Sequence, residues 1–200
     1  MDKASSKRPP PAANPEEEAR LLEEQCPGLA GADYRVTSAS TKTYNCVAWS
    51  VDDFERCWSP MPGIPSAIGG AIEPIGGYHW PKDLPALMGI ETLKELFRRR
   101  GFSACETTNP EDGVEKVAIY GDEIICTHVA VQRLGEPWTS KMGDRADIEH
   151  TQAAAIECGL VGQIQAVLRR ATNPASASAV SEPAKPRLAL GRSWRRQRPR

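Results

Sequence analysis

The sequence predicts an α+β domain in which helices pack on a small antiparallel β-sheet. Helical signals dominate the first half of the chain, whereas three β-branched segments follow one another between residues 114 and 142. A tight turn separates the last two of these segments. Consecutive strands joined by short turns pair in an antiparallel sheet, and the flanking helices then cover it.

Two helices are expected before residue 60. The first begins at Pro15, because Asn14 is a favourable N-cap and proline suits the first helical position, and it ends at Pro27-Gly28. Residues 29–43 are expected to be loop or irregular strand. Asn45 is again a good N-cap, and the apolar side chains after it predict a short helix over about residues 45–56.

The middle of the chain is expected to be a long ordered loop followed by a helix. Residues 59–90 contain six prolines and six glycines, a density that prevents long regular elements. A helix is predicted over Ile90–Arg100, because apolar side chains recur at helical spacing up to Phe97 and Gly101 occupies the C-terminal cap position.

The second half is predicted to be a β-meander followed by two helices. The expected strands are Val114–Tyr120, Ile124–Leu134 and Trp138–Met142. The expected helices, separated by Gly159, are Asp147–Glu157 and Leu160–Arg170.

Tails of biased composition flank a single predicted domain, residues 14–171. Residues 1–13 and 172–200 are rich in Pro, Ala and Ser or in charged residues, so both are expected to be disordered. Residues 181–200 carry seven basic side chains against one acidic side chain, a net +6, which leaves −7 for the rest of a chain whose total is −1. The sequence therefore predicts an acidic domain with a basic tail.

The six cysteines show no pairing pattern, and no C-x-x-C motif is present. No apolar segment follows the first basic residues, and no run approaches the roughly 18 apolar residues of a membrane span. These features predict a cytoplasmic protein with free thiols, without a membrane span or a structural metal.

Cys46 and His128 together indicate a class of reaction, in which a thiol acts as nucleophile and an imidazole as its base. Cys46 follows the Asn45 cap, so it lies in a first helical turn, where unpaired amide groups favour the thiolate. His128 lies inside an apolar predicted strand and projects from one face of the sheet. A thiol and an imidazole presented in this way form the nucleophile and base of papain-like enzymes. The alternative is that both residues are packed core side chains.

A catalytic pair would have testable properties. Cys46 would be the most reactive of the six thiols, and its sulfur would lie roughly 3–4 Å from His128 or one water away. A third group would orient the imidazole. Ser140, Asp147 and His150 follow His128 closely enough, and Asp147 is favoured because a carboxylate stabilises the imidazolium. For His150, the alternative of a capped, solvated helix start is stronger.

At these residues the chain resembles a largely bacterial family of domains of unknown function. The shared motifs lie between residues 44 and 170 and correspond to Tyr44–Trp49, Lys116–Tyr120, Thr127-His128, Trp138–Lys141 and Asp147–His150. The resemblance implies no activity. More distantly, a cysteine-bearing helix before a histidine-bearing strand is similar to the element order of the papain-like superfamily, an analogy of order alone.

Two functions are supported by these observations. The first is cysteine-dependent acyl transfer by an amide or ester hydrolase, a deamidase or a transglutaminase-like enzyme, with Cys46 as nucleophile, His128 as base and Asp147 as orienting group. Such an enzyme needs no cofactor and would act on a peptide or protein substrate. The alternative is a non-catalytic protein-interaction domain in which these residues are structural. Contact of the arginine-rich tail with nucleic acid is a third hypothesis, against which the acidic domain argues.

Overall fold

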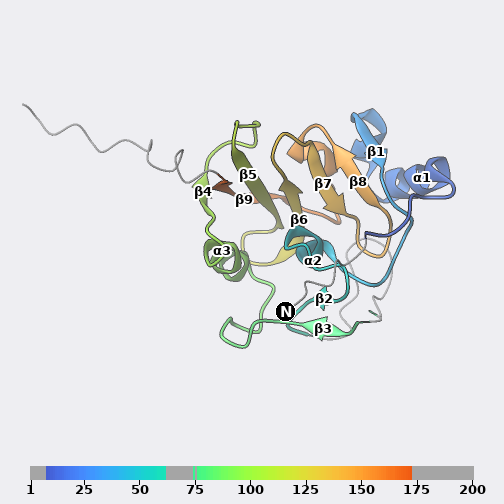
Figure 1. Cartoon of the computed structure of the whole chain (residues 1–200). Coiled ribbons are helices and arrows are strands. Elements are labelled where there is room, and N and C mark those ends of the chain that lie inside the picture. The colour runs from blue at the N-terminus through green and yellow to red at the C-terminus, as the bar shows by residue number, and fades with distance from the viewer. Residues whose placement is uncertain (1–7, 62–73, 75, 173–200) are drawn as a thin grey trace, which may run out of the picture.

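Most strands of the protein belong to one antiparallel sheet (Figure 1). The structure is a computed structural model that describes residues 8–61, 74 and 76–172. The seven strands of the sheet are β1 (Tyr34–Val36), β4 (Ser103–Cys105), β5 (Val114–Gly121), β6 (Cys126–Gln132), β7 (Trp138–Lys141), β8 (Asp147–His150) and β9 (Gln163–Ala171). They are arranged in the order β1-β8-β7-β6-β5-β9-β4. A separate parallel pair is formed by β2 (Cys57–Trp58) and β3 (Tyr78–His79).

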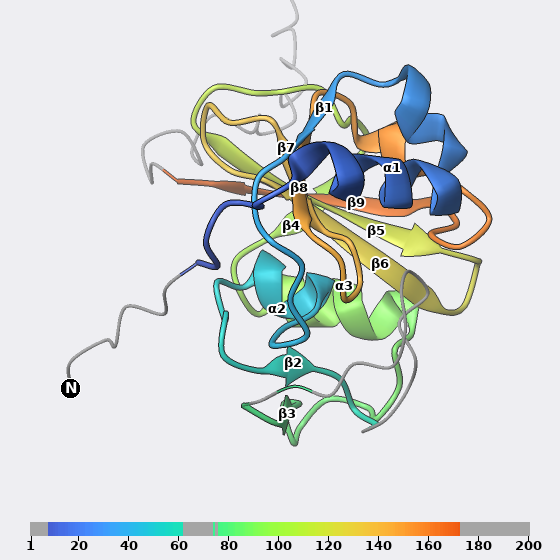
Figure 2. The same ribbon diagram turned by 90° about the vertical axis from the view of Figure 1, so that its right-hand side faces the viewer.

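Helical elements cover both faces of this sheet (Figure 2). The helix α1 (Pro15–Gln25) lies on one side, while α2 (Cys46–Ser50) and α3 (Ile90–Arg98) lie on the other. Two 3₁₀ turns, η1 (Pro27–Gly31) and η2 (Ala153–Ile156), pack on the same side as α1. We call the two sides the α1 face and the α2 face.

Each face carries its own apolar core. The core of the α2 face joins both helices to the sheet through residues such as Val47, Leu93, Phe97, Val117 and Val129. The core of the α1 face includes Leu22, Leu29, Tyr120, Trp138 and Ile156. Because successive strand residues point to opposite faces, strands buried on both sides are apolar almost throughout. β5 and β6 therefore form the centre of the molecule.

Several elements confirm the sequence prediction. The side chain of Asn14 accepts a hydrogen bond of 3.2 Å from the amide of Glu17 at the start of α1. The predicted third helix is present as α3, and β5, β6 and β7 form the predicted meander. The helix α2 is shorter than predicted: it ends at Ser50, and Asp52 adopts a positive φ of 61° that stops it.

The predicted fold class is wrong, because the protein is mainly β rather than a set of helices on a small sheet. The error lies in residues 147–170, which were predicted as two helices and instead form β8, η2 and β9. In β9 the apolar side chains of Ile164, Ala166 and Leu168 alternate along the chain. This strand inserts between β5 and β4 and enlarges the sheet.

A β-bulge shifts the register between β5 and β6. Tyr120 pairs with His128, but Gly121 pairs with Cys126, so Thr127 is left without a partner residue across the ladder. Gly121 has a φ of 155°, and a Cβ atom there would lie 1.9 Å from the carbonyl oxygen of Ile125. Glycine is therefore required at the bulge.

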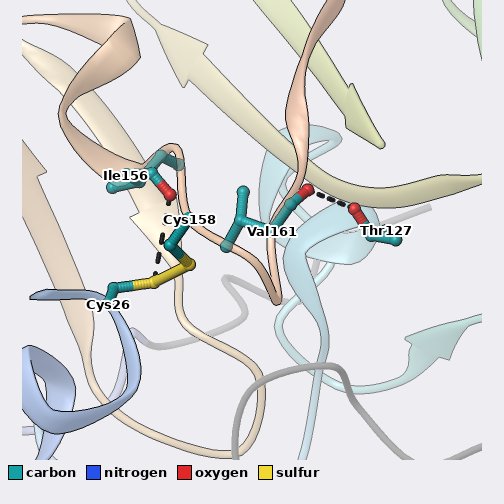
Figure 3. The surroundings of a disulfide bond; sticks show 5 residues. All are labelled: Cys26, Thr127, Ile156, Cys158 and Val161. Carbon is teal, nitrogen blue, oxygen red and sulfur yellow. Dashed lines mark hydrogen bonds between the residues drawn. A yellow bond between two sulfur atoms is a disulfide. The ribbon is translucent and has the colours of Figure 1, made fainter. Parts of the chain in front are cut away.

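A disulfide joins Cys26, at the end of α1, to Cys158, in the segment that precedes β9 (Figure 3). The two Cα atoms are 5.5 Å apart, although 132 positions separate them in the sequence. The prediction of six free thiols is therefore wrong for this pair, because the pairing depends on how the two faces of the fold assemble. The free cysteines are Cys46, Cys57, Cys105 and Cys126.

Some predictions fall outside the described residues. These concern the disorder of residues 1–7 and 173–200, the nucleic-acid contact of the basic tail, and much of the long loop, residues 62–73 and 75. Residues 8–13 are described and have no helix or strand. No helix in the described ranges is both long enough and apolar enough to span a bilayer.

Candidate functional site

Cys46 is the first residue of α2 and is held there by its neighbour Asn45. The side-chain oxygen of Asn45 accepts hydrogen bonds of 3.1 Å from the amides of Ala48 and Trp58, and its amide nitrogen donates to the carbonyl of Trp58 at 2.8 Å. Asn45 thus caps α2 and ties it to β2. The side chain of Cys46 is only 8 % exposed and belongs to the core of the α2 face.

Burial also controls the acidity of this thiol. It raises the pKa of Cys46, and hydrogen bonding with the backbone of Val129 and the charge of Lys141 oppose this only in part. The short helix and its cap therefore do not lower the pKa of this thiol below its ordinary value.

His128 lies in β6 and is 3 % exposed. Its ring lies edge-on to that of Tyr120, with the two ring centres 5.7 Å apart. Its Nε2 atom is buried and has no hydrogen-bond partner in the part of the chain that the structure describes. Burial, together with the charges of His150 and Lys141, lowers the pKa of His128 to about 3.

The sheet separates Cys46 from His128. Val129 and Val131 of β6 pack with Cys46 in the core of the α2 face, whereas Ala130 belongs to the core of the α1 face. His128 alternates with Val129 and pairs with Tyr120, so its side chain also points to the α1 face. The Cys46 thiol therefore contacts the backbone of Val129, next to His128, while the imidazole of His128 points to the opposite face of the sheet.

Asp147 lies on the same face as Cys46, but it orients a tyrosine instead of a histidine. The hydroxyl of Tyr44 donates a 2.7 Å hydrogen bond to Oδ2 of Asp147. Burial raises the pKa of Asp147, and the charge of Lys141 and the Tyr44 hydrogen bond oppose this rise. The other carboxylate oxygen, Oδ1, is buried without a hydrogen-bond partner among the described residues.

Lys141 completes this buried cluster. It is opposite Asp147 in the β7–β8 ladder and has no exposed surface. Its ammonium donates to the carbonyl of Arg145 and lies 5.4 Å from the centre of the Tyr44 ring. Burial lowers the pKa of Lys141 to about 8, and the charge of Asp147 opposes this. Sequence reasoning missed this lysine, although it is the one charged residue in a short strand between Trp138 and Met142, and that is the signal that marks it.

Ser140 and His150 lie on the other face, with His128. The Oγ atom of Ser140 is 3.1 Å from Nε2 of His150, and Nδ1 of His150 is 2.7 Å from the carbonyl oxygen of Gln152. A carbonyl only accepts hydrogen bonds, so Nδ1 carries the proton and Ser140 donates to Nε2. His150 is thus a buried strand residue and does not lie at a solvated helix start as was predicted.

The two buried histidines predict loss of stability in acid. Burial lowers the pKa of His150 to about 4 and that of His128 to about 3, below the unfolded value near 6.5. The native state therefore holds both rings neutral, and its stability falls as the pH drops from about 6.5 towards 4 and 3, where the unfolded state binds more protons. For His150 alone the shift corresponds to about 3 kcal/mol.

Denaturant unfolding between pH 8 and 4 measures this effect. Replacing His128 by Phe is expected to flatten the curve, because one of the groups that must stay neutral is then removed. Arg98→Ala, a change in an exposed ion pair on the surface of α3, serves as the control. A stability that is constant from pH 7 to 5 would contradict the burial of neutral rings.

Of the three predicted catalytic residues, Cys46 and Asp147 lie on the α2 face and His128 lies on the α1 face. The fold and its two buried polar clusters instead define a mainly β domain with a helical layer on each side. No group of three or more His, Cys, Asp or Glu side chains in the described ranges is placed to hold a metal ion. Residues 35–169 match the family described as a domain of unknown function, DUF7689, and the chain belongs to this family. Neither the curated proteins nor the solved structures contain a significant match.

Proposed function

We propose that this domain is a non-catalytic protein-interaction domain in which the motif residues are structural. The observation that carries the proposal is that Cys46 and His128 point to opposite faces of the sheet. A general base must lie within hydrogen-bond reach of the proton that it removes. An imidazole separated from the thiol by a β-sheet does not meet this requirement.

The burial of the same side chains supports the proposal. A substrate carbonyl would have to reach Cys46 through the packed α2 core, and the imidazole of His128 would have to accept a proton in an environment that holds its pKa near 3. Asp147 already accepts a hydrogen bond from Tyr44. Each motif residue therefore has a role in packing or in connecting α2 to the sheet.

An exposed apolar patch supports a role in protein contact. Leu87, Ile124 and Ile125 are all exposed, and Ile124 keeps 69 % of its surface. Gly89 forms a β-bridge with Ile125 and lies against both the Leu87 side chain and the Ile124 carbonyl, so these residues adjoin. Adjoining exposed apolar side chains are typical of surfaces that bind other proteins.

The alternative function is cysteine-dependent acyl transfer with Cys46, His128 and Asp147. It requires a rearrangement of β6 that turns His128 to the α2 face. The resemblance to papain-like enzymes adds only the order of one helix and one strand, which constrains function weakly.

Thiol labelling distinguishes the two functions. In the native wild-type chain at pH 6–7, Cys105 is expected to react with iodoacetamide first, because it is the free cysteine that is partly exposed. Cys46 is expected to react more slowly by about ten-fold or more, since its thiol is buried and burial raises its pKa. Mass spectrometry of the labelled peptides gives the order. If Cys46 is instead labelled fastest, and if this rapid labelling is lost when His128 is replaced by Asn, the enzymatic function is supported and the proposal is overturned.

A further inference from the structure

Three aromatic rings gather around α2. The ring centres of Tyr44, Trp49 and Phe54 lie 5.4–6.1 Å from one another. The guanidinium carbon of Arg8 lies 5.2 Å from the ring centre of Trp49 and 6.0 Å from that of Phe54. These distances are those of cation–π contacts, in which the ring face attracts a positive charge.

Arg8 is attracted to this position by the aromatic rings and by the negative charge of the buried Asp147 carboxylate. Among the described residues, its guanidinium makes no hydrogen bond or ion pair, although its side chain is exposed. Below the rings, Asp147 provides a negative charge, and the charge of Arg8 in turn opposes the effect of burial on the pKa of that carboxyl. A second arginine, Arg133, also lies over the Trp49 ring, 5.6 Å from its centre, and is paired with Asp52. In contrast to Arg133, Arg8 is therefore attracted by the ring faces and by the charge of Asp147 alone among the described residues.

The residues after Arg8 extend the contact. Pro9, Pro10 and Pro11 follow it directly, and the carbonyl of Pro10 accepts a 2.8 Å hydrogen bond from the amide of Ala39. Proline fixes φ, so such a segment loses little conformational freedom when it binds. Aromatic surfaces that take up proline-rich segments are a common mode of peptide recognition.

We propose that the surface formed by Trp49, Phe54 and the Ala39 amide is a binding site for an arginine–proline segment of a partner protein. In the free chain, Arg8–Pro10 occupies this site as an internal ligand. The proposal specifies the partner chemistry of the protein-interaction function and rests on it. A partner segment must displace Arg8–Pro10, so its apparent affinity for the free protein is reduced.

A labelled peptide with the sequence of residues 6–13 tests the site on the full-length chain. Fluorescence anisotropy is measured with wild type, with Arg8→Ala and with Arg98→Ala, which removes an exposed arginine that pairs with Glu95 on α3. Arg8→Ala is expected to bind the peptide up to about five-fold more tightly than the other two, because the internal ligand is weakened by the loss of the same arginine contact. The same peptide with Arg8 replaced by Ala is expected to bind about five-fold more weakly.

A second variant locates the binding surface. Phe54→Leu, added to Arg8→Ala, removes one ring while leaving an apolar side chain, and it is expected to abolish the gain in affinity at an unchanged melting temperature. The site would be overturned if wild type and Arg8→Ala bound the peptide equally well or if neither bound it. It would also be overturned if replacing the arginine of the peptide had no effect on binding. A reactive Cys46 alongside peptide binding would refute only the non-catalytic function, whereas a protected Cys46 without peptide binding would refute only this site.

Discussion

Replacing Cys26 and Cys158 together by serine is expected to lower the free energy of unfolding by about 2–5 kcal/mol. The bond closes a loop across a sequence separation of 132, so its loss frees a large part of the unfolded chain. It also ties the end of α1 to the segment before β9, and both of these pack on the α1 face. At this chain length the melting temperature is expected to fall by roughly 5–15 °C.

Cys105→Ser is the matched control, because it removes a free, partly exposed thiol. Its melting temperature is expected to stay within about 2 °C of wild type. Treating wild type with a reductant is expected to reproduce the effect of the double variant. A double variant as stable as wild type would contradict a structural role for the bond. Disulfides persist mainly in oxidising compartments, so the cytoplasmic prediction loses the support that free thiols gave it.

Replacing Asp147 by Asn is expected to destabilise the protein by about 3–5 kcal/mol, because it leaves the buried ammonium of Lys141 without its opposite charge. Lys141→Met is expected to cost a similar amount, since the buried carboxylate keeps its hydrogen bond from Tyr44 but loses the buried ammonium that offsets its charge. Chemical denaturation at pH 7 measures both changes. The Asp147→Asn cost is expected to shrink above pH 8, where Lys141 loses its proton more readily.

The double variant Lys141→Met, Asp147→Asn measures the interaction between the two side chains apart from their contacts with other residues. Its loss of stability is expected to be smaller than the sum of the single losses, because neither charge is left alone. Lys94→Met is the control: this lysine pairs with Glu91 on the surface of α3, and its removal is expected to change stability by less than about 0.5 kcal/mol. Additive losses in the double variant would mean that the two side chains do not interact.

The elements that were predicted correctly have strong local signals. Asn14 and Pro15 mark the start of α1, and the apolar spacing up to Phe97 marks α3. The strand β9 was missed because its pairing is not local: Val114 faces Ala171 across the ladder. A short segment with apolar residues at both helical and alternate spacing takes its structure from such partners.

The candidate site also could be predicted only in part from the sequence. The sequence placed Cys46 in a helix and His128 in a strand, and both placements are confirmed. Their relative orientation was not predictable, because it depends on the unpaired Thr127. The roles of Lys141 and Tyr44 depend on which residues of β7 and β8 share a face, and that too requires the register of the sheet.

The bulge at Thr127 determines which chemistry the α2 face presents. Cys126 lies on that face, and regular alternation along β6 would place His128, two residues later, on the same face. Because Thr127 is an extra, unpaired residue, His128 and the residues after it point to the faces opposite to those that regular alternation predicts. Removing Thr127 would give a regular ladder in which Gly121 still pairs with Cys126 and Tyr120 with His128, so the imidazole would stay on the α1 face. Only a one-residue slip that makes Thr127 a paired residue would turn the imidazole towards the cysteine. The glycine that the bulge requires, Gly121, is therefore the sequence feature that accompanies a histidine turned away from the thiol in this chain.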